Sequence, residues 1–423
     1  KERLIKEGKI KKGKKSAKTS DKPHYPFELP KGWCFTNIGE LLINQDGERK
    51  PVSSAIRSKQ SNKIYDYYGA AGVIDKIDDY LFDEKLLLIG EDGANLLSKS
   101  KNNAFFAEGK YWVNNHAHVL DATDKNLLEY VAIVINAIKL DDYITGSAQP
   151  KLSQDNLNKI PIVLPPLSEQ KRIMEAIIHW SLLIEQIEQN KIDLQASIKQ
   201  AKSKVLDLAI HGKLVQQDPN DEPASELLKR INPKAEIITD NGHYQKLPEG
   251  WTICKLKDIC SKLVDGDHNP PKGTKETTEY LMLSAQNIVN DNIVYTNGVR
   301  YLNHDAFETS DKRTKVMQGD LLITIVGTLG RSCVFSDNKK ITLQRSVACL
   351  TPLIYNHFLK YYMDSSSIQK YMTTNAKGTA QKGFYLNQLE QLPIMIPPLT
   401  EQQRIVARIE KIFARLDVIE SAL

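Results

Sequence analysis

The sequence predicts an α+β protein with two β-rich domains, joined by long antiparallel coiled-coil helices and related by a pseudo-two-fold internal repeat. Three observations predict this arrangement. The string IPIVLPPLSEQKRI at 160–173 returns with few changes as LPIMIPPLTEQQRI at 392–405. The string LPKGW at 29–33 returns as LPEGW at 247–251. After each PPL string, apolar residues recur at the three-four spacing of a helix that packs on another helix.

Length and composition place the chain among globular proteins. Its 423 residues, 41% of them hydrophobic, suffice for two or more domains with cores of their own. No apolar run is long enough to span a bilayer, and the Lys-rich start lacks a signal-peptide core. Five cysteines without paired spacing fit a reducing cytoplasm and argue against a zinc site or a disulfide framework. We therefore expect a cytoplasmic protein, and the initial Lys1 suggests a fragment or trimmed chain.

The positive charge is concentrated at the N-terminus. The net charge is +5, but residues 1–22 hold ten Lys or Arg against three Asp or Glu, so the remainder is slightly acidic. The string KKGKK within this arm has two interpretations, a phosphate-binding arm or a solvated linker, and the sequence leaves both open.

The two copies differ most between their shared landmarks. LLLIGEDG (86–93) resembles LLITIVGTLG (321–330), and both read as buried strands that end in a Gly-rich turn. The second copy is 14 residues longer between landmarks, so insertions must lie in its loops. We divide the chain into a basic N-terminal connector (1–28), a first β-rich domain (29–160), a first helical spacer with its connector (161–246), a second β-rich domain (247–392) and a truncated second helical spacer (393–423).

Each PPL string predicts the start of a helix. The paired prolines block helix upstream, and Ser168 and Thr400 occupy the expected N-cap positions. Thr400–Gln403 fits a capping box, whereas Lys171 breaks the box in the first copy. The first helix should run from Ser168 to a stop at His211-Gly212, about 65 Å at ~1.5 Å per residue.

The apolar seams predict what these helices pack against. A helix that long must have another helix as its partner. We favour antiparallel pairing of the two helices within one molecule, and the alternative is a coiled coil that dimerises the chain. The seam positions are Ile173, Ile177, Trp180, Ile184, Ile187, Leu194, Ile198 and Val205 in the first helix, and Ile405, Ile409, Ile412, Leu416 and Ile419 in the second.

Strings that suggest catalysis are weak, and we expect no catalytic residue and no metal ligand. Asn269-Pro270-Pro271-Lys272 resembles the NPP-aromatic motif of amino-methyltransferases, but Lys272 cannot stack on a flipped base. The Lys-rich string at 8–15 lacks the Ser or Thr of a phosphate-binding loop, and Glu108-Gly109-Lys110 only faintly resembles a nuclease site. The nine His lack ligand spacing. His116 and His118 alternate on an expected strand, so one should face the core and one the surface.

Together these features resemble the specificity subunit of a type I restriction-modification enzyme over essentially the whole chain. The motifs that carry the resemblance are the two repeated strings, GKLVQQDPNDEPASELL (212–228), YYGAAGVID (67–75), IGEDGANL (89–96), WVNNHAHVL (112–120), GSAQPKLSQ (146–154), DGDH (265–268) and GDLLITIVGTLG (319–330). The resemblance implies two target-recognition domains, each reading half of a bipartite site in double-stranded DNA. It also implies two methyltransferase subunits as partners, and motor-nuclease subunits in the full complex. This chain would hold no cofactor, because S-adenosylmethionine would be bound by the methyltransferase subunits.

Candidate DNA-contacting residues follow from the chemistry of base edges. Arg and Lys suit guanine, Asn and Gln suit adenine, and both are expected on protruding polar loops. For each residue the alternative is a solvated surface group. The first-domain candidates are Arg57, Lys59, Lys63, Tyr68, Lys99, Lys101, Asn115, His116, Gln149 and Lys151. The second-domain candidates are Asp267, His268, Lys272, Thr328, Arg331, Gln344, Arg345, Lys377, Gln381 and Lys382.

We therefore expect a non-catalytic DNA-reading scaffold whose coiled coil sets the gap between two half-sites. Two other classes remain open at this point. One is a self-contained DNA adenine methyltransferase or a fused restriction-methylation enzyme, and the other is a coiled-coil assembly protein without DNA affinity.

Overall fold

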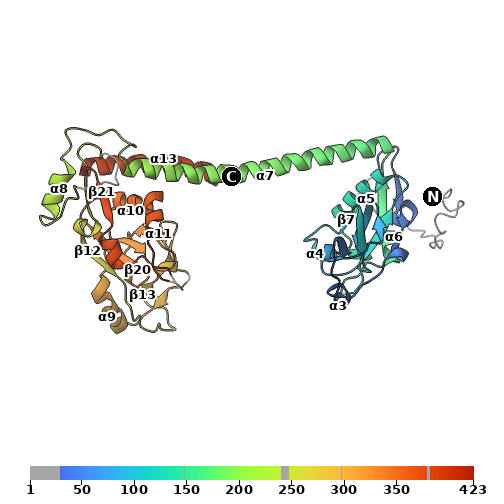
Figure 1. Cartoon of the computed structure of the whole chain (residues 1–423), viewed down its shortest axis with the longest axis horizontal. Helices are drawn as coiled ribbons and strands as arrows, with labels where there is room; N and C mark the ends of the chain where they lie inside the picture. The colour runs from blue at the N-terminus through green and yellow to red at the C-terminus, as the bar shows by residue number, and fades with distance from the viewer. Residues whose placement is uncertain (1–28, 147, 240–246, 297, 379–381) are drawn as a thin grey trace. The chain divides into compact units, whose positions relative to one another are not determined.

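The computed structural model describes residues 29–146, 148–239, 247–296, 298–378 and 382–423 (Figure 1). The chain forms two compact units, and the division between them falls after Gln186, inside one long helix. Each unit has its own sheets and its own core. The expected N-terminal connector (1–28) and the candidate Gln381 lie outside the described residues.

Three sheets build the first unit. Two are four-stranded, with strand orders β2-β9-β6-β7 and β4-β3-β8-β5, and the third pairs β1 with β10 antiparallel. The strands are β1 (Cys34–Asn37), β2 (Ile43–Asn44), β3 (Tyr65–Gly69), β4 (Gly72–Ile77), β5 (Phe82–Asp83), β6 (Leu86–Gly90), β7 (Ala104–Ala107), β8 (Lys110–Val113), β9 (Ala117–Asp121) and β10 (Pro161–Leu164).

Short helices cover these sheets. They are α2 (Ile38–Leu41), α3 (Ser54–Arg57), α4 (Asn95–Ser98), α5 (Lys125–Ala137) and α6 (Gln154–Lys159). Helix α5 begins at Asp124, whose carboxylate accepts from the Asn126 backbone N–H. Leu128, Val131 and Ile135 are spaced along one face of the helix and are buried in the core that includes β6. An apolar run at 131–138 therefore belongs to an amphipathic helix that the sequence analysis did not assign.

The second unit repeats this plan. Its sheets have the orders β12-β20-β17-β18 and β16-β13-β19, with the pairs β11-β21 and β14-β15. In both units a parallel pair, β3-β8 or β13-β19, lies within an otherwise antiparallel sheet. The strands are β11 (Thr252–Lys255), β12 (Cys260–Asp265), β13 (Tyr280–Leu283), β14 (Ile288–Val289), β15 (Asn292–Ile293), β16 (Arg300–Tyr301), β17 (Leu321–Thr324), β18 (Ser332–Val334), β19 (Lys340–Leu343), β20 (Val347–Pro352) and β21 (Pro393–Ile396).

The second unit also contains several helices. They are α8 (Ala224–Ile231), α9 (His304–Thr314), α10 (Asn356–Asp364), α11 (Ser366–Thr374), α12 (Leu386–Glu390) and α13 (Leu399–Ser421). The expected central strands are confirmed in both units. All five residues of β6 and all four of β17 are buried, as the continuous apolar runs predict for strands covered on both faces.

The two repeated strings contact each other within each unit. The Trp33 indole donates to the Glu169 carboxylate at 3.0 Å, and the Trp251 indole donates to Glu401 at 3.1 Å. The strands that follow Trp33 and Trp251 pair antiparallel with the strands that precede the prolines. The two strings thus recur together because they contact each other where each β-rich domain meets its long helix.

The helix caps differ from those expected. The long helix α7 spans Leu167–Ile210 and α13 spans Leu399–Ser421, so Ser168 and Thr400 already lie inside the first turn. The capping box at Thr400 is wrong, because Pro398 takes the cap position and the Thr400 hydroxyl donates to Asp221 instead. The predicted stop is confirmed. Gly212 adopts φ +64 just past the helix, and the Lys213 N–H bonds the Leu208 carbonyl.

Helix α13 packs antiparallel on the C-terminal part of α7, as expected for one molecule (Figure 1). Lys191 donates to the Leu423 carbonyl, while Lys202, further along α7, pairs with Asp417 at 2.7 Å and with Glu420 at 2.8 Å. The order of these contacts runs in opposite directions along the two helices. Both helices bury apolar residues in the same core.

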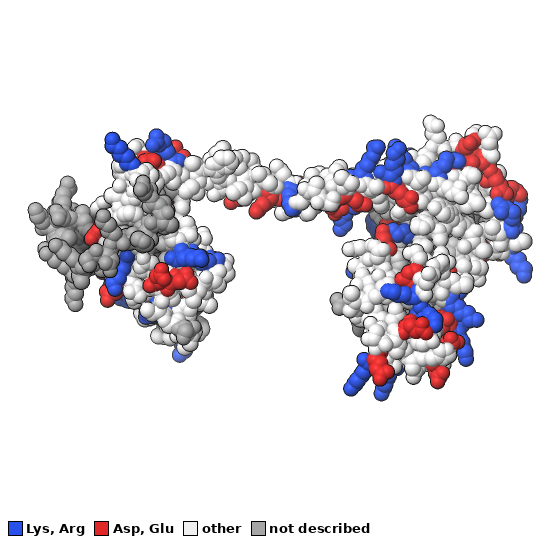
Figure 2. All heavy atoms as spheres, turned by 180° about the vertical axis from the view of Figure 1, so that it is seen from behind, with Lys and Arg blue, Asp and Glu red and all other residues white. Residues whose placement is uncertain are grey.

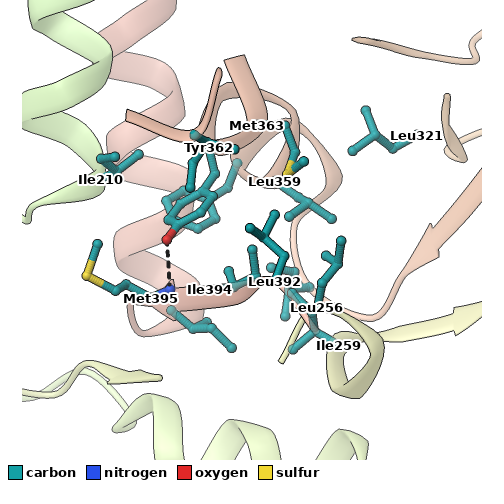
Figure 3. Close-up of a cluster of buried hydrophobic side chains, with 14 of the residues drawn as sticks. Ile210, Leu256, Ile259, Leu321, Leu359, Tyr362, Met363, Leu392, Ile394 and Met395 are labelled. Atoms are coloured by element: carbon teal, nitrogen blue, oxygen red, sulfur yellow. Dashed lines mark hydrogen bonds between the residues drawn. The ribbon is translucent and has the colours of Figure 1, made fainter. Parts of the chain in front are cut away.

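That core fixes the helix pair to the second unit (Figure 3). Ile210 of α7 lies in one apolar cluster with residues of α10 and β21. Tyr362 is 2% exposed, and its hydroxyl accepts from the Met395 N–H at 3.2 Å. The phenol therefore satisfies a backbone donor of β21 inside an otherwise apolar cluster.

The predicted seam is buried only where α13 covers it. Ile198, Ile405 and Ile409 are at most 3% exposed. Toward the N-terminal side of α7, by contrast, Trp180 is 63% exposed and Ile187 is 67% exposed. On the face shown in Figure 2, the surface of α7 is largely uncharged over part of its length, with interspersed acidic and basic side chains. This stretch of α7 is thus an apolar stripe without a partner among the described residues.

Candidate nucleic-acid interface

The same backbone framework holds the loops at one end of each unit. The Glu91 N–H bonds the His116 carbonyl in the first unit, and the Ile325 N–H bonds the Ser346 carbonyl in the second. Three more matched pairs follow the same pattern: Leu152–Glu91 with Phe384–Ile325, Asn114–Tyr68 with Gln344–Leu283, and Thr145–Lys151 with Lys377–Gly383. These bonds make Asn115 the counterpart of Arg345. They also make Glu91 and Asp92 the counterparts of Ile325 and Val326.

In the second unit these loops enclose a pocket. Its volume is about 560 Å³, and four predicted residues meet there: Thr328, Arg331, Gln344 and Arg345. The remaining lining residues are Ser284, Ala285, Gln286, Val326, Gly327 and Ser346. They come from the loops after β13 and β17 and from the β19–β20 turn. Residues far apart in the sequence thus converge, as a recognition site on loops requires.

The pocket is positive and rich in hydrogen-bond donors. Arg331 and Arg345 supply two guanidinium groups, and the lining contains no carboxylate. Within the described residues, the side chains of Gln344 and Arg345 make no hydrogen bond or ion pair, whereas Gln286 donates to the Gly298 carbonyl at 3.1 Å. An exposed arginine with a nearby unpaired amide suits a ligand that offers acceptors.

The first unit has a different chemistry at the matched positions. Glu91 pairs with Arg49 at 2.7 Å and with Lys151 at 3.2 Å, while Asp92 pairs with His116 at 2.7 Å. Two carboxylates thus stand where the second unit has Ile325 and Val326. Of the predicted residues, Asn115, His116 and Lys151 are brought together here, and two of the three already have a carboxylate partner.

A buried histidine, His118, connects two segments of the first unit next to these loops. His118 is fully buried, its Nδ1 faces the Asp46 carboxylate at 2.6 Å, and its Nε2 faces the Leu152 carbonyl at 2.8 Å. Each ring nitrogen therefore has an oxygen partner, one from a side chain and one from the backbone. His116 is exposed, which confirms the expected division between a core and a surface histidine. Burial alone would raise the pKa of Asp46, but the hydrogen bond and charge of His118, with the Arg49 charge, bring it below its usual value.

Several other predicted residues have structural partners in the first unit. Arg57 bonds Asp75 at 2.8 Å and stacks over the Tyr67 ring, and Lys63 bonds the same carboxylate at 2.7 Å. Tyr68 is half-buried against Phe105 and Tyr111. Lys99 donates to carbonyls at the end of α5. The side chains of Lys59, Lys101, Asn115 and Gln149 are exposed.

The predicted residues of the second unit outside the pocket also fall into two groups, those with structural partners and those that are exposed. The Asp267 carboxylate accepts from the Ser310 hydroxyl at 2.6 Å, and His268 bonds Asp265 at 2.7 Å. Lys272, Lys377 and Lys382 are exposed. Lys377 and Lys382 belong to the loop next to the pocket, because Gly383 bridges both Val326 and Lys377.

Sequence reasoning missed part of both sites. Gln286 and Ser284 were not candidates, since a short 3-10 turn after β13 brings them to the pocket. Glu91 and Asp92 lie in the motif at 89–96 but are not among the predicted DNA-contacting residues. Two adjacent carboxylates directly after a buried strand are the sequence signal that could have identified them as site residues. The described residues do not gather three His, Cys, Asp or Glu side chains as a metal site would need. No helix in the described ranges is both long and apolar enough to cross a membrane.

Comparison with known proteins identifies the class that this fold and loop end define. The sequence model of the Type I restriction modification DNA specificity domain matches twice, over residues 30–198 and 248–422. Those two stretches make up most of the chain, so this is a DNA specificity protein. More particularly, the chain belongs to the family of type I restriction-modification specificity subunits, which are the non-catalytic subunits of such systems.

Individual relatives and solved structures agree. The chain is 29% identical to the EcoBI specificity subunit of Escherichia coli over 278 residues, which is 64% of this chain and 55% of that protein. It is 24% identical to the EcoEI specificity subunit of Escherichia coli over 99% of this chain and 84% of that protein. Thus the match spans about half of the first relative and most of the second.

Among solved structures, the HsdS subunit from Thermoanaerobacter tengcongensis aligns with a TM-score of 0.54 at 15% identity, covering 94% of this chain and 93% of that one. A chain from a study of assembly and conformational transition of the type I R-M system aligns at 0.59, also at 15% identity, over 94% of both. These likenesses confirm the predicted α+β fold.

Proposed function

We propose that this chain reads a bipartite DNA target, with one half-site recognised by the loop end of each unit. The observation that carries the proposal is the pair of matched backbone frameworks, which hold different side chains in the two units. A shared framework presents loops in the same way, and different side chains suit different base sequences. Such an arrangement serves a target with two unlike halves.

The proposal extends to partners. The exposed apolar stripe on α7, with Trp180, Ile184 and Ile187 each at least 55% exposed, supports docking of helices from another subunit. We assign this role to two methyltransferase subunits, which would bind S-adenosylmethionine and methylate adenine. Restriction and motor subunits would join the full complex. The coiled coil would set the gap between the half-sites.

The structure gives little support to the alternative function, a self-contained methyltransferase. In the Asn269–Lys272 string, Lys272 stands where an aromatic ring would have to stack on a flipped base. The Lys272 side chain is exposed, and the neighbouring Pro271 carbonyl accepts from the Arg300 guanidinium at 2.7 Å. The comparisons give that alternative no support either.

Methylation mapping tests the proposal. The chain is produced together with methyltransferase subunits from its own system in a host without methylation, and methylated adenines are mapped genome-wide. We expect one bipartite motif with a fixed gap, present only when this chain is present. Transfer of label from S-adenosylmethionine to DNA by the purified chain alone would contradict the proposal, and so would methylation at a continuous motif.

A further inference from the structure

The turn between β19 and β20 presents Arg345 from a rigid backbone. The Gln344 N–H bonds the Leu283 carbonyl at 2.8 Å, the Arg345 N–H bonds Asp267 at 3.0 Å, and the Val347 N–H closes the turn on Gln344 at 3.0 Å. The backbone is thus held from three sides, while the Arg345 and Gln344 side chains line the pocket without partners among the described residues. A fixed backbone with an available side chain is the arrangement expected of a reading residue.

The charge of the pocket restricts what can enter. Two guanidinium groups and no carboxylate line a volume of about 560 Å³. Guanidinium only donates hydrogen bonds, so the ligand must present acceptors. On DNA, the candidates are the O6 and N7 atoms of guanine in the major groove and the phosphate oxygens.

The amides favour guanine over phosphate. The unpaired Gln344 amide offers a donor and an acceptor, and Gln286, whose amide nitrogen donates to Gly298, still offers its amide oxygen; together they match the mixed edges of base pairs. A phosphate presents acceptors alone and would leave the amide oxygens unused. Val326, Gly327 and Ala285 add small uncharged residues to the lining. We infer that the pocket of the second unit recognises a guanine in its half-site and that Arg345 is the residue that reads the guanine O6 and N7 atoms.

The first unit cannot read guanine in the same way. Asn115 occupies the position of Arg345, and the Glu91 and Asp92 carboxylates occupy those of Ile325 and Val326. Carboxylates beside this position would repel the O6 and N7 acceptors. The assignment is therefore specific to one half-site, and it rests on the proposed function.

The test uses the assembled complex of full-length chain and methyltransferase subunits on its mapped target. Arg345→Ala is expected to lower discrimination for one guanine by roughly 5- to 150-fold in competition binding at fixed salt, and to leave the other half-site unchanged. Arg345→Lys should retain part of the discrimination for guanine. Replacing that guanine by 7-deazaguanine removes N7 without any change in the protein. It should weaken the wild type but not Arg345→Ala.

Two controls accompany these variants. Asn115→Ala changes the matched position of the first unit and should affect only the other half-site. Lys257→Ala removes an exposed charge of the second unit outside the pocket lining and should leave base preference unchanged. A thermal melt verifies that each variant is folded.

Each result decides the matter. If Arg345→Ala weakens all DNA equally and reduces the salt slope by about one, the contact is to phosphate and the inference is wrong. If the relaxed position is not guanine, or 7-deazaguanine has no effect, it is also wrong. If the wild-type complex shows no sequence preference, the proposed function fails and this inference fails with it.

Discussion

Two indole–carboxylate hydrogen bonds fasten the repeated strings to each other, one in each unit. The two bonds have nearly equal lengths but different surroundings. Glu401 is fully buried and also accepts from Gln217 at 3.2 Å, whereas Glu169 is only partly buried. Burial raises the pKa of Glu401, because desolvation outweighs the hydrogen bonds from Gln217 and Trp251.

Loss of the buried indole donor should therefore cost more stability. We expect Trp251→Phe to lower the free energy of unfolding by about 1–3 kcal/mol, because it leaves a buried acceptor underused. The matched variant Trp33→Phe should cost clearly less, since water can replace the donor at Glu169. Urea denaturation of both variants measures the difference, and equal losses would contradict the role of burial.

Asp46 should make the first unit sensitive to acid. Its folded pKa is lowered, so its contribution to stability is complete above its ordinary pKa of about 4. That contribution is lost as pH falls through the folded value. We expect the stability difference between wild type and Asp46→Asn to shrink from pH 7 to pH 3. Urea denaturation across this range provides the measurement, and a constant difference would argue against the His118–Asp46 pair.

The structure shows which partners each predicted DNA-contacting residue has, which the sequence could not show. Thr328, Arg331, Gln344 and Arg345 share one pocket, but Gln286 was missed because its loop is distant in sequence. Arg57 is a predicted DNA contact because it lies in a basic loop. In the fold its guanidinium lies over the Tyr67 ring beside Asp75. Which side of a loop faces solvent depends on neighbours that sequence spacing cannot show.

At the scale of elements, the three-four apolar spacing correctly predicted both long helices, and α7 differs from its expected ends by one residue. The burial of each seam residue determines how much the pairing of α7 with α13 contributes to the stability of the fold at that position. Ile409 is fully buried beneath α7 and α10, whereas Ile419 is 46% exposed near the end of α13.

We expect Ile409→Ala to cost about 2–5 kcal/mol of unfolding free energy, from lost burial and a residual cavity. Ile419→Ala, which deletes the same atoms, should cost less than about 1 kcal/mol because the side chain is already half exposed. Both losses are obtained from denaturant midpoints. Comparable costs would mean that α13 packs along its whole length in solution.

For the whole molecule, α7 is the one continuous element that belongs to both units. Under the proposed function its length sets the gap in the target. Four residues inserted between Gln186 and Lys191 precede the contact with Leu423. The insertion therefore lengthens α7 by about 6 Å without entering the α13 contact.

This insertion should widen the gap of the methylated motif by about two base pairs at ~3.4 Å each. Both half-sites should keep their sequence, because neither loop end is touched. Methylation mapping of the variant complex gives the answer. An unchanged gap would show that α7 does not act as a ruler. As a control, the same insertion between the exposed residues Pro233 and Lys234 should leave the gap as it was.

The sequence by itself determined the repeat, the two long helices, the central strands and the family, because these depend on local periodicity and on strings that recur. Only the tertiary structure showed that LPxGW and PPL strings form one joint, since a Trp–Glu contact across about 136 residues has no local signature. Only it showed which polar loops converge on a pocket. Those loops follow strands that are far apart in the chain, and backbone hydrogen bonds bring them together. Such bonds do not depend on which side chains are present, so the sequence carries no signal for them.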